Sequence, residues 1–322
     1  MAKALEEKLA RVGTLDASTV EGCEQLRKAL GDKSNLVVAK VAKRILREKI
    51  AELAGELPGV FMRLMAGGTA ADKGCMAKLE IAQAIYQLGA AMDGAEEALV
   101  AGVHHVQMGP TFGGMVDTAP ELRGVCALGL VRMGYRDVMM ELADLLADKE
   151  PQARIMAARA IAYAGVESGA LLLRLKVLSG DPDTTVMAEC FTALVQLTPA
   201  KALPLLERFL DRGDTDLAQE AAIAIASSRR EEALGILCRH WEKDITRRES
   251  LLVPLAILRR PEAVEMLLSV IESGPEALAL AATDAMGMYR SDATVAQRVL
   301  ASAKSRGPAV QRAAVKALGD SD

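Results

Sequence analysis

The sequence predicts an all-α protein built from about nine stacked helix pairs. The first observation behind this prediction is composition: 51% of the 322 residues are hydrophobic, but only 3% are aromatic. The core must therefore be assembled from Ala, Leu, Val, Ile and Met, most of which favour helices. Strand-rich folds depend on aromatic and β-branched side chains, and four Phe, four Tyr and one Trp are too few for them.

The second observation is an internal repeat with a period of about 32 residues. Each copy has an apolar or small residue at one position and again four, seven and eight positions later. These offsets lie on one face of a helix, so each copy predicts an amphipathic helix with a narrow seam of small side chains. The first position of the pattern falls at Val38, Ala77, Leu122, Ala153, Val186, Leu217, Ser250, Leu278 and Val310.

The third observation is that another helical segment and a set of turn residues accompany each copy. Residues 138–148, 202–211 and 263–273 carry Leu, Val and Met at helical spacing just before a copy of the pattern. Gly and Pro then stop one helix and start the next, as at Gly180 to Pro182 and at Gly307-Pro308. The unit is therefore helix, turn, helix, and only stacked neighbours can bury its apolar stripe.

The repeat resembles the HEAT-repeat family, in particular the short bacterial HEAT-like and phycobilin-lyase-type repeats. In that family an Asp in the turn within a repeat and an Arg six residues later form a ladder between neighbours. The matching residues here are Asp72 with Lys78, Asp117 with Arg123, and Asp148 with Arg154. The resemblance implies a right-handed α-solenoid, and we expect residues 1–322 to form one such domain.

Two steps of the repeat, from Val38 to Ala77 and from Ala77 to Leu122, are longer than the others. Because Asp72 and Asp117 keep their distance from the following helix, the extra chain must lie just before them. We therefore expect turn insertions at about 66–71 and 107–116. In a solenoid these two turns share one rim, so the insertions are expected to be neighbours in space.

The second insertion is the main candidate for partner binding. It follows His104 and His105 and carries Phe112 among glycines, and loops on a rigid scaffold are where binding residues concentrate. A site for a partner or a small ligand would use His104, His105, Gln107 and Phe112. The alternative is that the histidines only end a helix, with His105 near its last carbonyl groups.

A basic stripe near the N-terminus is the second candidate. Lys40, Lys43, Arg44 and Arg47 have spacings that place them opposite the apolar residues of their helix. Such a stripe could hold an acidic partner or phosphates. The alternative is that it is only the solvated side of a terminal repeat, which must be polar to keep the stack soluble.

Neither the cysteines nor any known catalytic motif in the sequence indicates an active site or a metal site. Cys23, Cys75, Cys126, Cys190 and Cys238 are widely separated, which argues against both a disulfide framework and a zinc site. Cys126 and Cys190 occupy positions that other repeats fill with Ala, so we expect them to be small buried residues. The sequence has no nucleotide-binding glycine loop, no HExxH and no GxSxG. We therefore expect no catalytic residues, no metal and no cofactor.

These observations predict a non-catalytic scaffold that binds a protein or peptide through a concave face lined by the second helices, through the 107–116 loop, or through both. Two relatives of the fold offer alternatives: alkylpurine DNA glycosylases, which grip DNA, and phycobilin lyases. With 39 basic and 43 acidic residues interspersed, we do not expect nucleic acid as the partner. We expect neither a secretory signal nor a membrane span, and place the protein in the cytoplasm, as a monomer or a homodimer.

Overall fold

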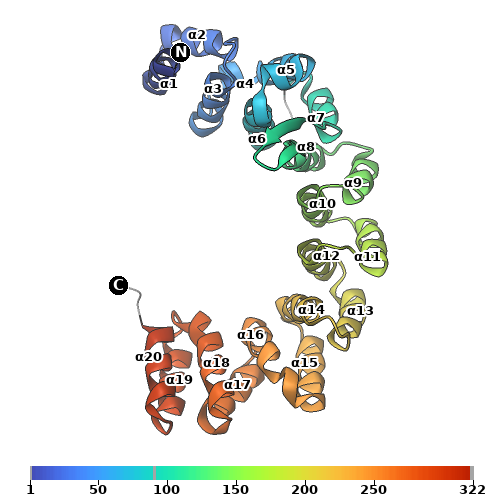
Figure 1. Cartoon of the computed structure of the whole chain (residues 1–322), viewed down its shortest axis with the longest axis vertical. Coiled ribbons are helices and arrows are strands. Elements are labelled where there is room, and N and C mark those ends of the chain that lie inside the picture. Colours follow the sequence, from blue (N-terminus) through green and yellow to red (C-terminus); the bar gives the residue numbers. More distant parts are fainter. Residues whose placement is uncertain (1, 90–91, 320–322) are drawn as a thin grey trace. The chain divides into compact units, whose positions relative to one another are not determined.

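The computed structural model describes residues 2–89 and 92–319. Helices account for nearly all of the regular structure in these residues, which confirms the predicted all-α class, and the strands form a single two-stranded hairpin (Figure 1). The chain divides into two compact units, Met1–Leu172 and Leu173–Asp322. None of the helices in the described residues is both long enough and apolar enough to cross a bilayer.

The first unit contains ten helices and the hairpin within its described residues, and helix α11 (Gly169–Ser179) contains its boundary. A 3-10 turn, η1 (Lys73–Cys75), separates α5 from α6, and the strands of the hairpin are β1 (Met108–Thr111) and β2 (Gly114–Asp117). The helices are α1 (Ala2–Thr14), α2 (Val20–Leu30), α3 (Asn35–Glu48), α4 (Ala51–Ala54), α5 (Leu57–Ala71), α6 (Met76–Leu88), α7 (Ala95–Val103), α8 (Pro120–Met133), α9 (Val138–Leu146) and α10 (Pro151–Ala164).

The second unit continues the same alternation of helices. Two 3-10 turns, η2 (Ile245–Arg247) and η3 (Gly287–Tyr289), interrupt it. Its helices are α12 (Thr184–Leu197), α13 (Pro199–Leu210), α14 (Thr215–Ser227), α15 (Glu231–Lys243), α16 (Arg248–Leu258), α17 (Pro261–Ser273), α18 (Glu276–Met286), α19 (Ala293–Lys304) and α20 (Pro308–Leu318).

The positions that define the sequence repeat fall in nine different helices of the described chain, namely every second helix from α6 to α20 together with α3. Within the first unit α3 packs on α6, α6 on α8 and α8 on α10, and within the second α12, α14, α16, α18 and α20 follow one another in the same way (Figure 1). The alanine-sized position of the pattern is fully buried, including at Cys126 and Cys190. The small-residue seam is therefore the contact between neighbouring repeats.

Glycines bring some of these helices closer than alanine would allow. A Cβ atom added to Gly124 of α8 would overlap the side chain of Met156 on α10, and one added to Gly129 would overlap Leu99 of α7. Helix ends are also set locally, because Asp183, like other turn carboxylates, accepts hydrogen bonds from the first backbone amides of the helix that follows it. Short sequence signals thus fix both the length and the spacing of the helices.

The two predicted insertions have different structures. Residues 66–71 do not form a turn; they extend α5, whose path breaks at Gly68, a residue with φ 56° and ψ −150°. The reason is that the alanines after Gly68 favour helix, while the glycine supplies the positive φ needed for the break. Residues 107–116 form most of the β-hairpin, which pairs Met108 with Asp117 and Thr111 with Gly114. Four-residue strands are too short to show a clear period of two in the sequence.

Candidate functional site

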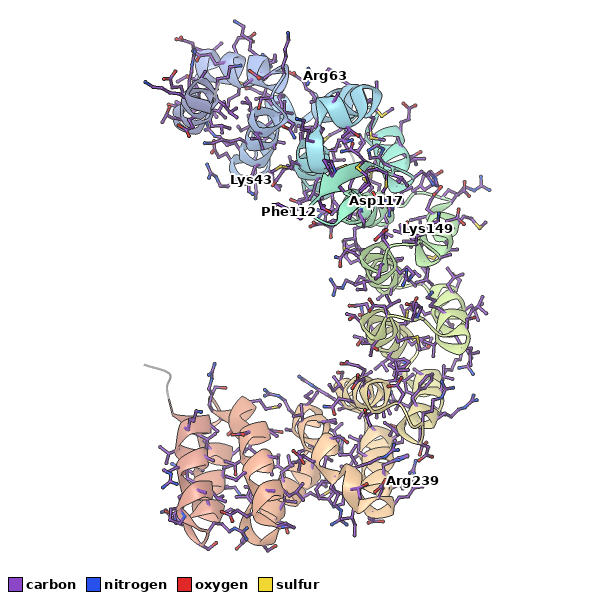
Figure 2. The ribbon with its side chains drawn as sticks, viewed as in Figure 1. Lys43, Arg63, Phe112, Asp117, Lys149 and Arg239 are labelled. Atoms are coloured by element: carbon purple, nitrogen blue, oxygen red, sulfur yellow. The ribbon has the colours of Figure 1, made fainter. Side chains whose placement is uncertain are left out.

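The hairpin between α7 and α8 is the candidate site. In the first unit α3, α6, α8 and α10 lie on one side and α5, α7 and α9 on the other, and the hairpin lies beside α6 and α8 (Figure 1). Polar side chains from both of these helices reach its base, as described below. Its free end carries Phe112, and its second strand ends at Asp117 (Figure 2).

Gln107, at the base of the hairpin, is almost completely buried and ties the hairpin to the turn before α6. Its Nε2 donates to the carbonyl oxygen of Asp72 at 2.8 Å, and its Oε1 accepts from Nζ of Lys78 at 2.6 Å. Its backbone amide donates to Oδ1 of Asp117 at 3.2 Å, which closes the base of the hairpin. Gln107 therefore acts as an anchor beneath the hairpin rather than as a surface contact.

Lys78 is fully buried and lies between α6 and the hairpin. Its Nζ is 2.8 Å from Nε2 of His105 in addition to its bond to Gln107. Removal from water disfavours the charged amine, so burial lowers the pKa of Lys78 below its ordinary value of 10.5. The amine of Lys78 thus contacts the hairpin and not the carboxylate of Asp72, which differs from the expected pairing of Lys78 with Asp72.

Asp72 is also fully buried, and it organises backbone instead of pairing with a cation. Its carboxylate accepts from the backbone amides of Ala77 at 3.0 Å and Lys78 at 2.9 Å, and from Nδ2 of Asn35 at 2.9 Å. These bonds cap the start of α6 and link it to α3 of the preceding repeat. A lysine at this position in place of arginine has a compact amine that can reach a different partner.

His105 lies half-buried next to Lys78. Burial, with a further contribution from the nearby Lys78, lowers the pKa of His105 below its ordinary value of 6.5, so the ring is neutral at neutral pH. Nε2 of this ring lies 2.8 Å from Nζ of Lys78 and 3.4 Å from Oε1 of Gln107. His105 is therefore a structural partner of the buried amine.

Arg123 of α8 carries the hairpin's second attachment. Its Nη1 lies 2.7 Å from Oδ2 of Asp117 and donates to the carbonyl of His105 at 2.9 Å, while its Nη2 donates to Asp148 of the next repeat at 2.9 Å. Arg123 has 3% of its side chain exposed, so this pairing is shielded from water. Arg154 donates to the backbone carbonyls of Asp148 and Lys149, each at 2.9 Å, so it reaches the turn between α9 and α10.

Val106, which precedes the buried base, and the two faces and tip of the hairpin carry exposed apolar side chains, which we together call the hairpin apolar surface. Phe112 is fully exposed at the tip, and Met115 is 59% exposed. Figure 2 shows Phe112 at the free end of the hairpin and Asp117 near the helices. The surface consists of Val106, Met108, Phe112, Met115 and Val116.

The four residues proposed from the sequence for this loop are therefore split between three places. His105 and Gln107 lie in the buried anchor, and Phe112 is at the tip. His104 points elsewhere, because its Nε2 lies 2.8 Å from Oε2 of Glu141 on α9. Sequence reasoning missed Met108 and Met115; exposed methionines in a glycine-rich insertion would have been the signal.

The basic stripe on α3 differs from its sequence prediction at Arg44. This side chain is buried and donates to the carbonyls of Val12 at 2.5 Å and Leu15 at 2.8 Å, at the end of α1. The sequence pattern of α3 shows which side of this helix is apolar, but it does not show that α1 covers Arg44 on the opposite side.

Three of the four basic side chains in the stripe have acidic partners within the first unit. Arg44 and Arg47 both pair with Glu48, Lys43 pairs with Glu80, and Lys40 is half-buried. The two carboxylates of Glu48 and Glu80 offset about half of the stripe's positive charge.

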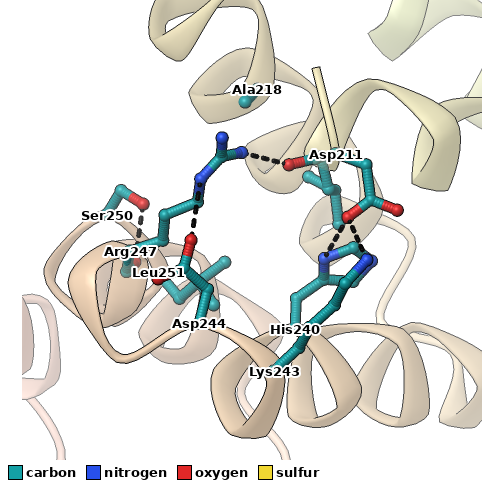
Figure 3. A pocket seen from close by; sticks show the side chains of 9 residues that line it. Asp211, Ala218, His240, Lys243, Asp244, Arg247, Ser250 and Leu251 are labelled. Carbon is teal, nitrogen blue, oxygen red and sulfur yellow. Dashed lines mark hydrogen bonds and ion pairs between the residues drawn. The ribbon is translucent and has the colours of Figure 1, made fainter. Parts of the chain in front are cut away.

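A cavity of about 310 Å³ in the second unit brings together a further set of charged residues, which the sequence did not single out (Figure 3). Asp211 accepts from Nζ of Lys243 at 2.7 Å and lies 3.5 Å from Nδ1 of His240. Arg247 donates to the carbonyl of Leu210 at 2.5 Å and so joins two neighbouring repeats. The charged side chains around this cavity are therefore already held by hydrogen bonds and ion pairs within the chain. The described residues contain no group of three or more His, Cys, Asp or Glu arranged to hold a metal ion.

Comparisons with known proteins give similarities of fold. No protein-family model matches the chain, and no curated protein matches it in sequence. A structure of human deoxyhypusine hydroxylase in complex with glycerol is similar at 16% identity with a TM-score of 0.35, covering 83% of this chain and 96% of that chain. A crystal structure of an engineered protein is similar at 16% identity with a TM-score of 0.37, covering 97% of each chain.

One prediction from the sequence is contradicted by these similarities. The missing catalytic motifs led to the expectation that the chain is not an enzyme. Deoxyhypusine hydroxylase, one of the proteins whose structures are similar to this chain, is an enzyme, which contradicts that prediction. The physical reason is that catalytic side chains of a repeat protein can come from separate repeats and leave no local motif.

Proposed function

We propose that this protein binds a partner protein through the hairpin apolar surface of its first unit. The observation that carries the proposal is Phe112, which is fully exposed at the end of a hairpin whose base is fixed by buried polar contacts. Several large apolar side chains exposed on one short segment often mark a surface that a partner covers. An exposed aromatic residue together with adaptable methionines on the same segment is also a common composition for a protein-binding surface.

The anchoring supports binding because it reduces the entropy lost on association. Lys78, Gln107 and Arg123 hold the base of the hairpin to α6 and α8 before any partner arrives. A surface that is already ordered needs little further ordering when it binds. The hairpin also lies beside α6 and α8, which are two of the second helices that the sequence predicts to line the binding face (Figure 1).

The charge distribution supports a partner with apolar side chains over one that presents phosphates. The five residues of the hairpin apolar surface carry no charge, and Lys43, Arg44 and Arg47 on the nearest basic stripe already have acidic partners. Affinity for a phosphate backbone comes from basic side chains that can release counterions. A peptide segment rich in apolar residues is therefore the proposed ligand class.

The test is selection of a displayed random peptide library on the wild-type protein, followed by fluorescence anisotropy with the enriched peptides. Phe112→Ser and Met115→Ser are each expected to weaken binding by about tenfold or more, the effect of removing a central contact residue. Met140→Ser, at an exposed methionine on α9 outside the surface, is the matched control and should leave affinity unchanged. Enriched peptides that bind Phe112→Ser and the wild type equally well would refute the proposal, as would a library that yields no binding peptide.

A further inference from the structure

We infer that the partner's segment binds as an added β-strand along the outer edge of β2. This inference rests on the proposed function and goes beyond it, because it specifies the conformation of the partner and the backbone groups that hold it. It depends on which backbone groups the hairpin already uses, and these follow from the strand register.

The register shows which residues of the hairpin bond to each other through the backbone. The amide of Thr118 donates to the carbonyl of Gln107 at 2.8 Å, so these two residues form a hydrogen-bonded pair. In an antiparallel pair of strands, hydrogen-bonded and non-hydrogen-bonded pairs alternate. Gly109 with Val116 is therefore the next hydrogen-bonded pair, and Met108 with Asp117 and Pro110 with Met115 are not hydrogen-bonded. The N–H and C=O groups of these last four residues point away from the opposite strand.

The two outer edges of the hairpin are not equivalent. On β1 an outward position is Pro110, which has no N–H, and a proline on an edge blocks the addition of another strand. On β2 the corresponding outward residue is Met115, which offers both an N–H and a C=O. Gly114, Met115 and Val116 include neither a charge nor a proline, the usual protections of an edge, and all three are exposed.

No other strand occupies this edge within the described residues, because the sheet there consists of β1 and β2 alone. The open edge ends at Asp117, whose carboxylate is held by Arg123 and by the backbone amide of Ala119. The available edge is therefore short, and it runs from the tip of the hairpin to its base.

The side chains beside this edge define the partner's chemistry. Residues of one strand point alternately to the two faces, so Met108, Pro110 and Met115 share one face of the hairpin, and all three are exposed. An added strand would place every second side chain on that same face, against Met115. The occupant is therefore an extended segment of a partner protein with apolar side chains at alternate positions.

The experiment uses a library-selected peptide and the full-length protein. We expect amide hydrogen exchange of Met115 to slow by about tenfold or more on saturation with the peptide, because its N–H becomes bonded. Peptides N-methylated at one residue at a time should lose about tenfold or more in affinity at every second position only. Met115→Pro should weaken binding to a similar extent, and circular dichroism with the exchange rate of the Thr118 amide checks that this variant keeps the hairpin.

Each outcome decides between distinct conclusions. Unchanged exchange of Met115 together with no alternation among the N-methylated peptides would overturn strand addition, while loss of binding in Phe112→Ser would still uphold the proposed function. Equal binding by Phe112→Ser and the wild type would instead reject the proposed function itself. A concentration-dependent dimer in sedimentation that Met115→Pro abolishes would show that a second copy occupies the edge, and would overturn the partner peptide as occupant.

Discussion

Nζ of Lys78 lies 2.6 Å from Oε1 of Gln107, so the buried amine of one helix holds the base of a hairpin that emerges in the next repeat. Both side chains are almost completely removed from water. A hydrogen bond between buried polar groups contributes modestly when it is present, but leaving one group without its partner costs much more. The hairpin's position is therefore linked to the packing of α6.

The first prediction concerns this link. Gln107→Ala removes the bonds to Lys78 and to the carbonyl of Asp72, and we expect the free energy of opening of the hairpin to fall by about 1–3 kcal/mol. Hydrogen-exchange mass spectrometry of residues 105–118 would show the faster exchange. Gln87→Ala, at an exposed residue of α6, is the matched control. Equal protection of the hairpin in both variants would show that Gln107 is not an anchor.

The second prediction concerns the bridge between repeats. Arg123→Met leaves the carboxylates of Asp117 and Asp148 without their shared cation, and we expect unfolding free energy to fall by about 3–5 kcal/mol. Chemical denaturation would measure this. The combined variant with Asp148→Asn should lose less than the sum of the single variants, since the two residues share one interaction.

The control for that bridge is Arg47→Met, whose side chain is 71% exposed beside Glu48. Exposed ion pairs contribute little, so its effect should stay within about 1 kcal/mol. If Arg123→Met proved no more destabilising than this control, the buried bridge would not be a stabilising element.

The third prediction is a pH dependence from His105. Its folded-state pKa lies below the ordinary 6.5, so as pH falls through about 6.5 the unfolded chain takes up a proton that the folded protein does not. The free energy of unfolding should therefore fall from pH 6.5 down to the lower folded-state pKa. In His105→Gln the free energy of unfolding should fall less over this pH range than in the wild type, as measured by denaturation at several pH values. His104→Gln, at a half-exposed residue, should retain it; identical pH profiles for wild type and His105→Gln would contradict the assignment.

The fourth prediction tests the close contact between α8 and α10. Gly124→Ala would force a methyl group into the side chain of Met156, and overpacking of this kind costs about 1–3 kcal/mol. Gly55→Ala is the control, since a Cβ there meets nothing within 4 Å and the backbone is α-helical. It should be neutral or stabilising by up to about 1 kcal/mol, as thermal denaturation would show. A Gly124→Ala variant as stable as Gly55→Ala would mean that the helices can separate without loss.

The sequence was informative where a signal is local. The offsets of four, seven and eight residues located the second helix of each repeat, because a helix places those positions on one face wherever it occurs. The burial of Cys126 and Cys190 followed from the same pattern, since their position faces the neighbouring repeat. The candidate site could be predicted only in part, because the sequence indicated the loop and Phe112 but not the exposed methionines of the hairpin.

Three results depended on contacts between distant residues. Arg44 is buried because α1 covers it, and the periodicity of α3 alone carries no information about α1. The amine of Lys78 contacts residues 27 and 29 positions later instead of Asp72, six positions earlier in the expected ladder. Residues 66–71 continue helix α5. The longer spacing of the sequence repeat showed that extra residues are present there, but not which structure they form.

The sequence by itself determined the all-α class, the repeating pairs of helices and the small-residue seam, since these follow from side-chain periodicity and turn chemistry within about 30 residues. Only the tertiary structure decided that the second insertion is a hairpin, that Gln107 lies beneath it and that Phe112 and Met115 lie on its surface. The physical reason is that burial is a property of what packs against a residue, and the groups that cover Gln107 and Lys78 come from other repeats of the chain.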